Sequence, residues 1–168
     1  MPIAISQIPG VSEPLRRYLW EVSFVRTPVG VGFPDGLKLR AVSARVPGRT
    51  FERIEINYQW MTWAVTGREA ADKEIELEFW EGTDLAVRKL FMEWLRRVGD
   101  WSIGTQGSRV EVTGDLQLKL LDGKGIPVRT IILRNVIPLA VEASELRYES
   151  NEVVTFTARF WYDWFEES

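Results

Sequence analysis

One uninterrupted run, RIEINYQWMTWAVTG from Arg53 to Gly67, restricts the fold of this chain more than any other feature. Its apolar residues alternate with polar ones, as the two faces of a β-strand do. No turn signal interrupts the run before Thr66-Gly67. An extended segment of this kind exposes unpaired backbone and aromatic rings unless another surface covers it. The simplest cover is a second copy of the same chain, so the run predicts self-assembly rather than catalysis.

The composition supports the same reading and excludes several kinds of chemistry. The 168 residues include 8 Trp, 8 Phe and 4 Tyr, which fit either a Trp-rich core or a set of interface anchors. His and Cys are both absent, so an imidazole base, a thiol nucleophile and a Cys/His metal site are excluded. We therefore expect no enzyme activity, no cofactor and no bound metal. A net charge of -3 provides no general basic field for nucleic acid.

The chain reads as one soluble domain spanning 1–168, with an extended N-terminal arm at about 1–14. Pro2, Pro9 and Pro14 disfavour regular structure in that arm. The start lacks the layout of a signal peptide, and no apolar run approaches the roughly 20 residues that span a bilayer. Insertion of the monomer into a membrane is therefore not expected. Basic residues are in excess at 1–55 and acidic residues at 142–168, which either steers head-to-tail association or is ordinary surface variation.

Strand patterns dominate, and one helix interrupts them. Thr83 and Asp84 offer N-cap chemistry for an amphipathic helix at about 84–98, whose apolar side chains recur at helical spacing. Pro138 is expected to end the strand that begins at Val128. The predicted fold class is mainly β (α+β), a β-sandwich or barrel of about seven or eight mostly antiparallel strands with one flanking helix. The predicted strands are Tyr18–Val25, Leu37–Val46, Thr50–Ile56, Trp60–Val65, Lys73–Trp80, Val110–Leu121, Val128–Leu133 and Glu152–Phe165.

An acidic row lies on the strand KEIELEFW. Glu74, Glu76 and Glu78 share one face, because strand side chains alternate with period two. Neighbours in such a row lie roughly 7 Å apart, which is within reach of the carboxylate pair of an inverting glycosidase. Nothing nearby in the sequence is apolar enough to raise one pKa, so a solvated face or the wall of a water-filled cavity is the better interpretation.

Tryptophan also suggests a different class of function. Trp60, Trp63, Trp161 and Trp164 are candidate stacking platforms for sugars, as in a carbohydrate-binding module. Within each pair the spacing of three residues does not fit one face of a straight strand. Sugar binding would therefore need a bend, or a platform split between faces.

The order of elements resembles the tail-tube protein family of contractile-tailed bacteriophages, whose fold is shared with the tubes of contractile injection systems and type VI secretion systems. A strand ending at Pro47-Gly48 precedes RIEINY, the W-x-V-x-G close at Trp63–Gly67 and the strand Ile75–Phe79. An acidic turn and a helix with Phe91 and Trp94 follow. The C-terminal match is the more specific one and runs ILRNVIPLAVEASELRYESNEVVTFTARFWYDWF. The Gly/Pro-rich segment Thr27–Gly36 departs from the family pattern.

The resemblance implies a structural subunit. Family members form hexameric rings that stack head-to-tail into a hollow tube, which conducts DNA into the host during genome ejection. It implies as partners other copies of the chain, the tail sheath, the baseplate, the tail terminator, the tape measure protein and DNA in the lumen. It also implies a location in the virion tail, assembled in the host cytoplasm. A baseplate tube-initiator or an injection-system tube subunit is the alternative.

Two groups of residues follow as hypotheses from this reading. We expect Arg53–Gly67 to form a long hairpin that reaches a neighbouring protomer. Its inter-subunit contact residues would be Ile54, Ile56, Tyr58, Trp60 and Trp63. The lumen-facing residues would be Glu74, Glu76 and Glu78, whose negative charge keeps DNA from adhering.

Overall fold

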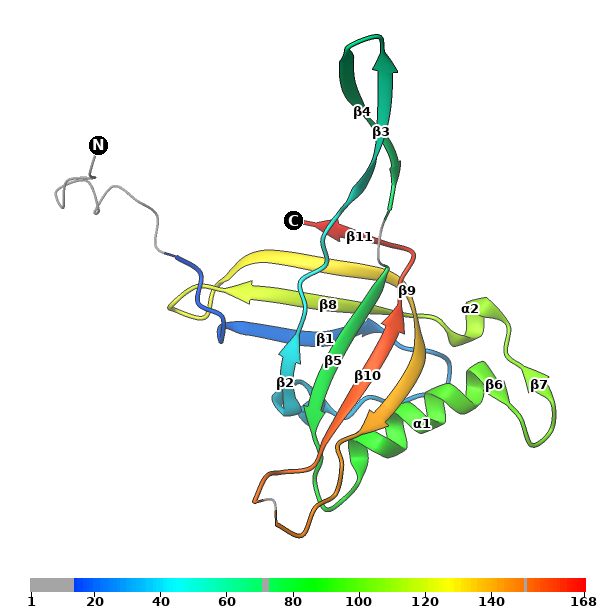
Figure 1. Cartoon of the computed structure of the whole chain (residues 1–168). Coiled ribbons are helices and arrows are strands. Elements are labelled where there is room, and N and C mark those ends of the chain that lie inside the picture. The colour runs from blue at the N-terminus through cyan, green and yellow to red at the C-terminus, as the bar shows by residue number, and fades with distance from the viewer. Residues whose placement is uncertain (1–13, 71–72, 150) are drawn as a thin grey trace, which may run out of the picture.

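The computed structural model describes residues 14–70, 73–149 and 151–168 (Figure 1). All but the last residue of the expected N-terminal arm at 1–14 lies outside this described part. The strands are β1 (Trp20–Arg26), β2 (Ala41–Ala44), β3 (Phe51–Tyr58), β4 (Met61–Glu69), β5 (Glu74–Trp80), β6 (Gly99–Asp100), β7 (Thr105–Gln106), β8 (Gly114–Leu121), β9 (Pro127–Ala143), β10 (Thr155–Trp161) and β11 (Trp164–Glu167). The helices are the 3-10 helix η2 (Asp35–Arg40), α1 (Ala86–Val98) and the single turn α2 (Arg109–Val112).

Seven strands form one antiparallel sheet, which confirms the mainly β prediction. The strand order is β1-β8-β9-β10-β5-β2, and β11 also pairs with β9. The order begins at β1 and ends at β2, so the sheet does not close into a barrel. Helix α1 flanks the sheet, and its observed range confirms the predicted helix at about 84–98.

The long strand β9 carries the chain from one half of the sheet to the other. Its first half pairs with β8 and β11, and its second half pairs with β10. In Figure 1 the direction of β1 and β8 crosses that of β5 and β10, and β9 bends between them. Asn135, at the bend, has a left-handed φ of 53°, which Asn tolerates better than most residues.

The expected end of a strand at Pro138 is wrong. Pro138 lies inside β9 opposite Phe160, and the register shifts there between Arg159 and Phe160. A bulge of this kind leaves one position without a ladder hydrogen bond, so a residue without an N–H is accommodated.

The core lies between the curled sheet and α1. The alternation predicted for β5 is confirmed, because Leu77 and Phe79 are buried, and Ala158 and Phe160 of β10 are buried in the same way. The helix contributes Trp94, whose ring centroid lies 5.6 Å from that of Phe160. Its indole N–H donates to the Val112 carbonyl at 2.6 Å, so the polar atom of the one fully buried Trp has a hydrogen-bond partner.

Three of the predicted strands are differently divided. Leu37–Val46 begins as η2, which brings Leu37 into the core before the short edge strand β2. Val110–Leu121 begins as α2, so β8 starts at Gly114. Glu152–Phe165 bends at Tyr162-Asp163 and supplies both β10 and β11. In two of the three cases the first residues of the alternating pattern are helical, so alternation alone did not determine where the strand begins.

Candidate functional site

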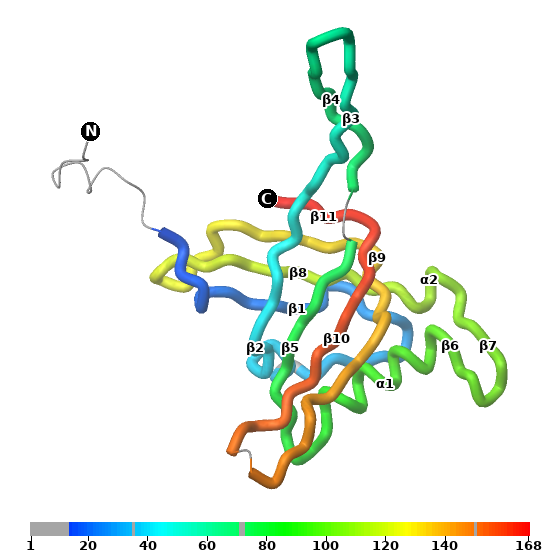
Figure 2. The backbone as a smooth tube through the Cα atoms, in the orientation of Figure 1, coloured from blue at the N-terminus to red at the C-terminus, as the bar shows by residue number. Residues whose placement is uncertain are grey.

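Strands β3 and β4 form a ribbon that stands away from the body of the protein (Figure 2). They pair with each other, and within the described residues they join no other strand. Tyr58 pairs with Met61, so only Gln59 and Trp60 make the turn. This confirms a hairpin within Arg53–Gly67, whereas the turn signal at Thr66-Gly67 marks no turn, since both residues lie in β4. Gln59 takes a left-handed φ of 50° without being Gly or Asn, so no sequence signal marked the turn.

One face of the ribbon is continuous and apolar. Cross-strand partners share a face in an antiparallel pair, and three such pairs follow one another here. They are Ile54 with Val65, Ile56 with Trp63, and Tyr58 with Met61. All six are exposed, from 38% at Ile56 to 70% at Tyr58. We call these six residues the apolar face of the ribbon.

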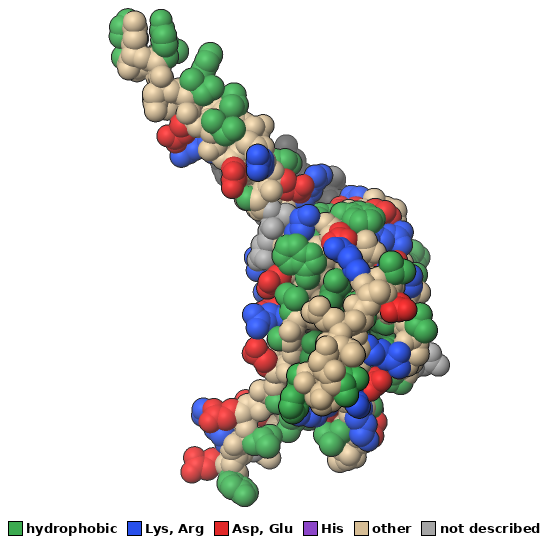
Figure 3. All heavy atoms as spheres, turned by 90° about the vertical axis from the view of Figure 1, so that its right-hand side faces the viewer, with side chains coloured by type: hydrophobic (Ala, Val, Ile, Leu, Met, Phe, Trp, Pro, Cys, Tyr) green, Lys and Arg blue, Asp and Glu red, His purple; other side chains and the backbone are tan. Residues whose placement is uncertain are grey.

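The five predicted contact residues are therefore brought together. Ile54, Ile56, Tyr58 and Trp63 lie on the apolar face, while Trp60 stands in the turn with 87% of its surface exposed. Figure 3 shows hydrophobic side chains gathered along the outer part of the ribbon, toward its tip, with charged side chains nearer its base. A monomer rarely leaves such a surface in water unless it binds something.

On the opposite face of the ribbon, polar side chains pair with one another. Arg53 pairs with Glu55 at 2.5 Å, and the Thr62 hydroxyl donates to the Asn57 side-chain carbonyl at 2.7 Å. Where the ribbon meets the body, Arg49 pairs with Glu69 at 2.6 Å. The ribbon is thus amphipathic: the polar side chains of one face pair with each other, whereas the six residues of the apolar face are exposed.

The acidic row lies apart from the ribbon on β5. Glu74 and Glu76 are exposed and Glu78 is partly buried, whereas the alternate residues of this strand point into the core. Across the pair β5–β10, Glu76 stands opposite Arg159, which forms an ion pair with Glu142 at 3.1 Å instead. The Ser43 hydroxyl lies 3.2 Å from Glu78. These contacts describe a solvated acidic face on the outside of the sheet.

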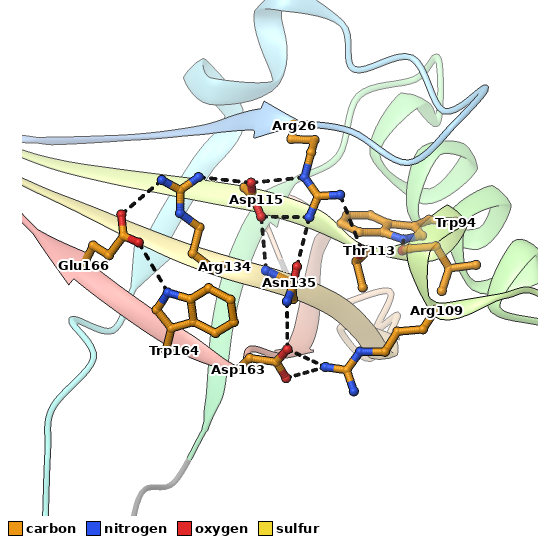
Figure 4. Close-up of polar contacts among 11 residues, drawn as sticks. Arg26, Trp94, Arg109, Thr113, Asp115, Arg134, Asn135, Asp163, Trp164 and Glu166 are labelled. Atoms are coloured by element: carbon orange, nitrogen blue, oxygen red, sulfur yellow. Dashed lines mark hydrogen bonds and ion pairs between the residues drawn. The ribbon is translucent and has the colours of Figure 1, made fainter.

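A polar cluster at the bend of β9 was not predicted (Figure 4). The buried Asp115 carboxylate accepts hydrogen bonds from Arg26 at 3.0 Å, Arg134 at 3.2 Å and the Asn135 backbone N–H at 3.1 Å. Burial acts to raise the pKa of Asp115, but the bonds from Arg26 and Asn135 outweigh it and lower that pKa. These residues are far apart in sequence, so only the register of β1, β8 and β9 brings them together.

A second carboxylate holds the same bend from the other side. The Asp163 carboxylate accepts from the side-chain amide of Asn135 at 2.9 Å and pairs with Arg109 (Figure 4). Burial acts to raise the pKa of Asp163, and the bonds from Asn135 and Arg109 lower it overall. Asn135 is therefore fixed by two carboxylates that are themselves neutralised by arginines, which is a structural role.

The tryptophans mark surface rather than core. Six of the eight are exposed and Trp94 alone is fully buried, which favours the interface interpretation of the composition. The aromatic contacts among the described residues join no two exposed indoles. Trp161 and Trp164 lie on different strands, on either side of the bend at Tyr162-Asp163. No sugar platform of paired rings is therefore formed by the four candidates.

Within residues 14–70, 73–149 and 151–168, no group of three or more acidic residues is placed to hold a metal ion. Over the same residues, every helix is too short or too polar to cross a lipid bilayer.

No protein-family model and no curated protein matches this sequence. Solved structures do match. A chain of the sheath-tube complex of an extracellular contractile injection system, PVC, in its extended state gives a TM-score of 0.68 over 99% of both chains, at 16% identity. The chain has the tail-tube fold.

Two further structures share the tail-tube fold. A chain of the sheath/tube terminator of that PVC system gives a TM-score of 0.69 at 14% identity, covering 94% of this chain and 99% of that one. A chain of the baseplate of the anti-feeding prophage (AFP) gives 0.69 at 19% identity, covering 94% of this chain and 97% of that one. The tail-tube fold thus occurs in assemblies described as sheath-tube, terminator and baseplate.

Proposed function

We propose that this chain is a structural subunit of the tube of a contractile tail, and that it assembles with copies of itself. The observation that carries the proposal is the ribbon, whose apolar face is exposed in the protomer. The tail-tube fold supports it, since the matching chains come from contractile machines. Identical neighbours would cover this apolar face, as the subunits of an obligate oligomer cover each other's apolar surfaces.

Six copies would close a ring, and rings would stack head-to-tail into a hollow conduit. Closing contacts and stacking contacts are both heterologous, because each joins two different surfaces of the same chain. The edge strands β1 and β2, at the two ends of the sheet order, offer backbone groups for pairing between neighbours in the ring. Such pairing would remove the exposed edges that otherwise promote aggregation.

We further propose that Glu74, Glu76 and Glu78 face the lumen. Their row lies on the outer surface of the sheet, on the side away from the core, and would form a negatively charged ring in a hexamer. A negative wall repels phosphate groups, so DNA would pass without adhering. In a phage tail the cargo would be DNA, with the tape measure protein in the lumen before ejection. Sheath, baseplate and terminator proteins would be the remaining partners, and the virion tail the location, after assembly in the host cytoplasm.

A second candidate within the same class has a specific observation in its favour. The matching chains include a tube terminator and a baseplate component as well as a sheath-tube complex. A subunit that forms a single initiating or terminating ring, or the tube of an injection system, would carry the same fold.

Electron microscopy of the purified protein, together with light scattering over a range of concentrations, separates these functions. Long hollow tubes are expected. Isolated rings would favour the initiator or terminator role. A monomer that stays monomeric at every concentration would contradict the proposal, and if it also bound glycans on an array it would support a carbohydrate-binding module.

A further inference from the structure

An open groove runs along the outer surface of α1. It lies between the helix, the loop at 30–34 and the hairpin β6–β7, and has a volume of about 840 Å³. Its apolar lining comprises Val31, Pro34, Leu90, Met92, Leu95 and Trp101. Lys89, Glu93 and Arg96 are also among the lining residues. We call this concavity the α1 groove.

Both sides of the α1 groove are held in place by named contacts. On one side, Arg97 donates to the backbone carbonyls of Val29 and Gly30, the latter at 3.1 Å. On the other side, Asp100 accepts from the Ser102 N–H at 2.9 Å and from Arg96 at 3.0 Å. A groove fixed in this way loses little conformational freedom when it is filled.

Trp101 is the most exposed indole of the protein. It lies in the β6–β7 hairpin beside the α1 groove, with 94% of its surface in water. Trp is enriched, with Tyr and Arg, among the interface positions that dominate binding, and such positions tend to pair with one another across an interface. The rings of the ribbon are the obvious counterparts, because Trp60 and Trp63 are also exposed, at 87% and 63%.

The ribbon and α1 lie at different heights of the protein, the helix on one side of the body and far from the ribbon. The ribbon leaves the top of the body in Figure 1, while α1 lies across its lower part. Simple translation of one copy along this direction brings the ribbon of one toward the α1 end of the next. An eight-residue strand spans roughly 26 Å and a thirteen-residue helix roughly 20 Å, so the two surfaces are of similar length.

The available area is also sufficient. Tyr58, Trp60 and Trp63 expose 63% to 87% of their surface, which amounts to roughly 400 Å² for rings of about 200 Å² each. The aliphatic residues of the apolar face add to this. A standard stable interface buries about 800 Å² per partner, so the ribbon supplies a large share of one.

We propose that the ribbon of one copy docks into the α1 groove of the next copy, with Trp101 packing against the rings of the ribbon. The inference rests on the proposed function and adds the acceptor surface to it. The contact joins two different surfaces and does not close on itself, so it would drive stacking rather than ring closure.

Complementation between two blocked variants tests this pairing. Trp63→Asp blocks the ribbon and leaves the α1 groove intact, while Met92→Glu blocks the groove and leaves the ribbon intact. Met92 is 44% exposed, so the change spares the core. Neither variant is expected to stack alone, because a desolvated carboxylate opposes docking. Mixed at equal amounts, the two variants should form a species of twice the mass of either variant alone. No larger species should form, since only one intact ribbon meets one intact groove.

Ile126→Glu is the matched control. Ile126 is 58% exposed in the loop between β8 and β9, away from both surfaces, and this variant should stack as the native protein does. If Met92→Glu also stacks as native, or the mixture behaves as the sum of its parts, the groove assignment is wrong. If the native protein itself never assembles, the proposed function is wrong, and the docking proposal that rests on it is wrong as well.

Cross-linking provides a second readout that does not depend on blocking variants. The chain has no Cys, so Thr62→Cys with Lys89→Cys introduces a single pair, one on the ribbon and one beside the α1 groove. A short bismaleimide should give a ladder of covalent multimers from assembled protein. Thr62→Cys with Lys124→Cys should give none. A ladder in the second pair alone would overturn the proposal.

Discussion

Glu81 and Asp115 are acidic residues whose carboxylates lie inside the protein and hold backbone N–H groups. Glu81 accepts from Val87 at 3.3 Å and Arg88 at 2.8 Å, both in the first turn of α1. Of the two expected N-cap residues, Asp84 accepts from the Ala86 N–H at 3.3 Å, so it shares the donors of the first turn with Glu81. Leu85 occupies the cap position itself, with a left-handed φ of 51°. A carboxylate at a helix N-terminus satisfies free donors and interacts favourably with the helix dipole.

Replacing Glu81 should therefore destabilise α1. We expect Glu81→Ala to lower the free energy of unfolding by about 2–3 kcal/mol, because a charged acceptor of several N–H groups is lost from a buried position. Urea unfolding in the Trp60→Asp background excludes any contribution from assembly. Glu76→Ala, on the exposed face of β5, should change the same quantity by less than about 0.5 kcal/mol. Equal effects of the two changes would contradict the capping role.

Asp115 should make stability depend on pH. Its pKa is lowered in the folded protein, so its contribution is complete above the ordinary Asp value of about 4 and is lost as the pH falls through the lowered pKa. We expect Asp115→Asn to cost about 1.5–3 kcal/mol at pH 7. The difference from the native residue should shrink below pH 4, where the Asp115 carboxyl of the unfolded chain becomes protonated before that of the folded protein. A difference that is the same at pH 7 and pH 3, measured by urea unfolding, would rule out this explanation.

At the scale of elements, the ribbon is the part of the fold that depends most on its surroundings. A two-stranded hairpin is marginally stable alone in water, and β3 and β4 pair with no third strand within the described residues. Its polar face and its base are stabilised by ion pairs of Arg53 with Glu55 and of Arg49 with Glu69. Its apolar face would become fully stabilised when a neighbour covers it.

Trp60→Asp should separate folding from assembly. The side chain is 87% exposed at the tip, so the fold should persist, while a charge that becomes buried in the contact opposes association. We expect monomers or small oligomers by light scattering, with an unchanged circular dichroism spectrum. Gln59→Gly alters the same turn but relieves a left-handed φ, so that variant should still form tubes. Tubes of Trp60→Asp protein would refute the assignment of the ribbon.

At the scale of the whole molecule, the sheet presents two unlike surfaces. One is buried against α1, and the other includes the row of Glu74, Glu76 and Glu78. Repeated six times around a ring, such a row would set the electrostatic character of the channel.

Reversing the charge of this row tests its place in the assembly. We expect a Glu74→Lys, Glu76→Lys and Glu78→Lys variant to form tubes that now retain DNA, because a positive wall binds phosphates. Retention should fall steeply between about 50 and 200 mM salt. The measurement is the binding of a labelled single-stranded oligonucleotide to assembled tubes. Loss of assembly would instead indicate that the row is buried between rings.

Local patterns in the sequence were sufficient for the elements. Alternation predicted the inward faces of β5 and β10, and helical spacing predicted α1, because both depend on the geometry of a single segment. The resemblance predicted the tail-tube fold from the order of these elements. The amphipathic ribbon was recognisable as extended and apolar, but its turn at Gln59-Trp60 carries no local signal.

Tertiary structure decided everything that depends on which segments meet. It carried β9 past Pro138, placed Asp115 between Arg26 and Arg134, and brought the β6–β7 hairpin beside α1. Composition alone did not decide whether the tryptophans belong to the core or to an interface, and in the structure six of the eight are exposed. The physical reason is that periodicity determines which side chains share a face, whereas only the packing of distant elements determines which face is covered.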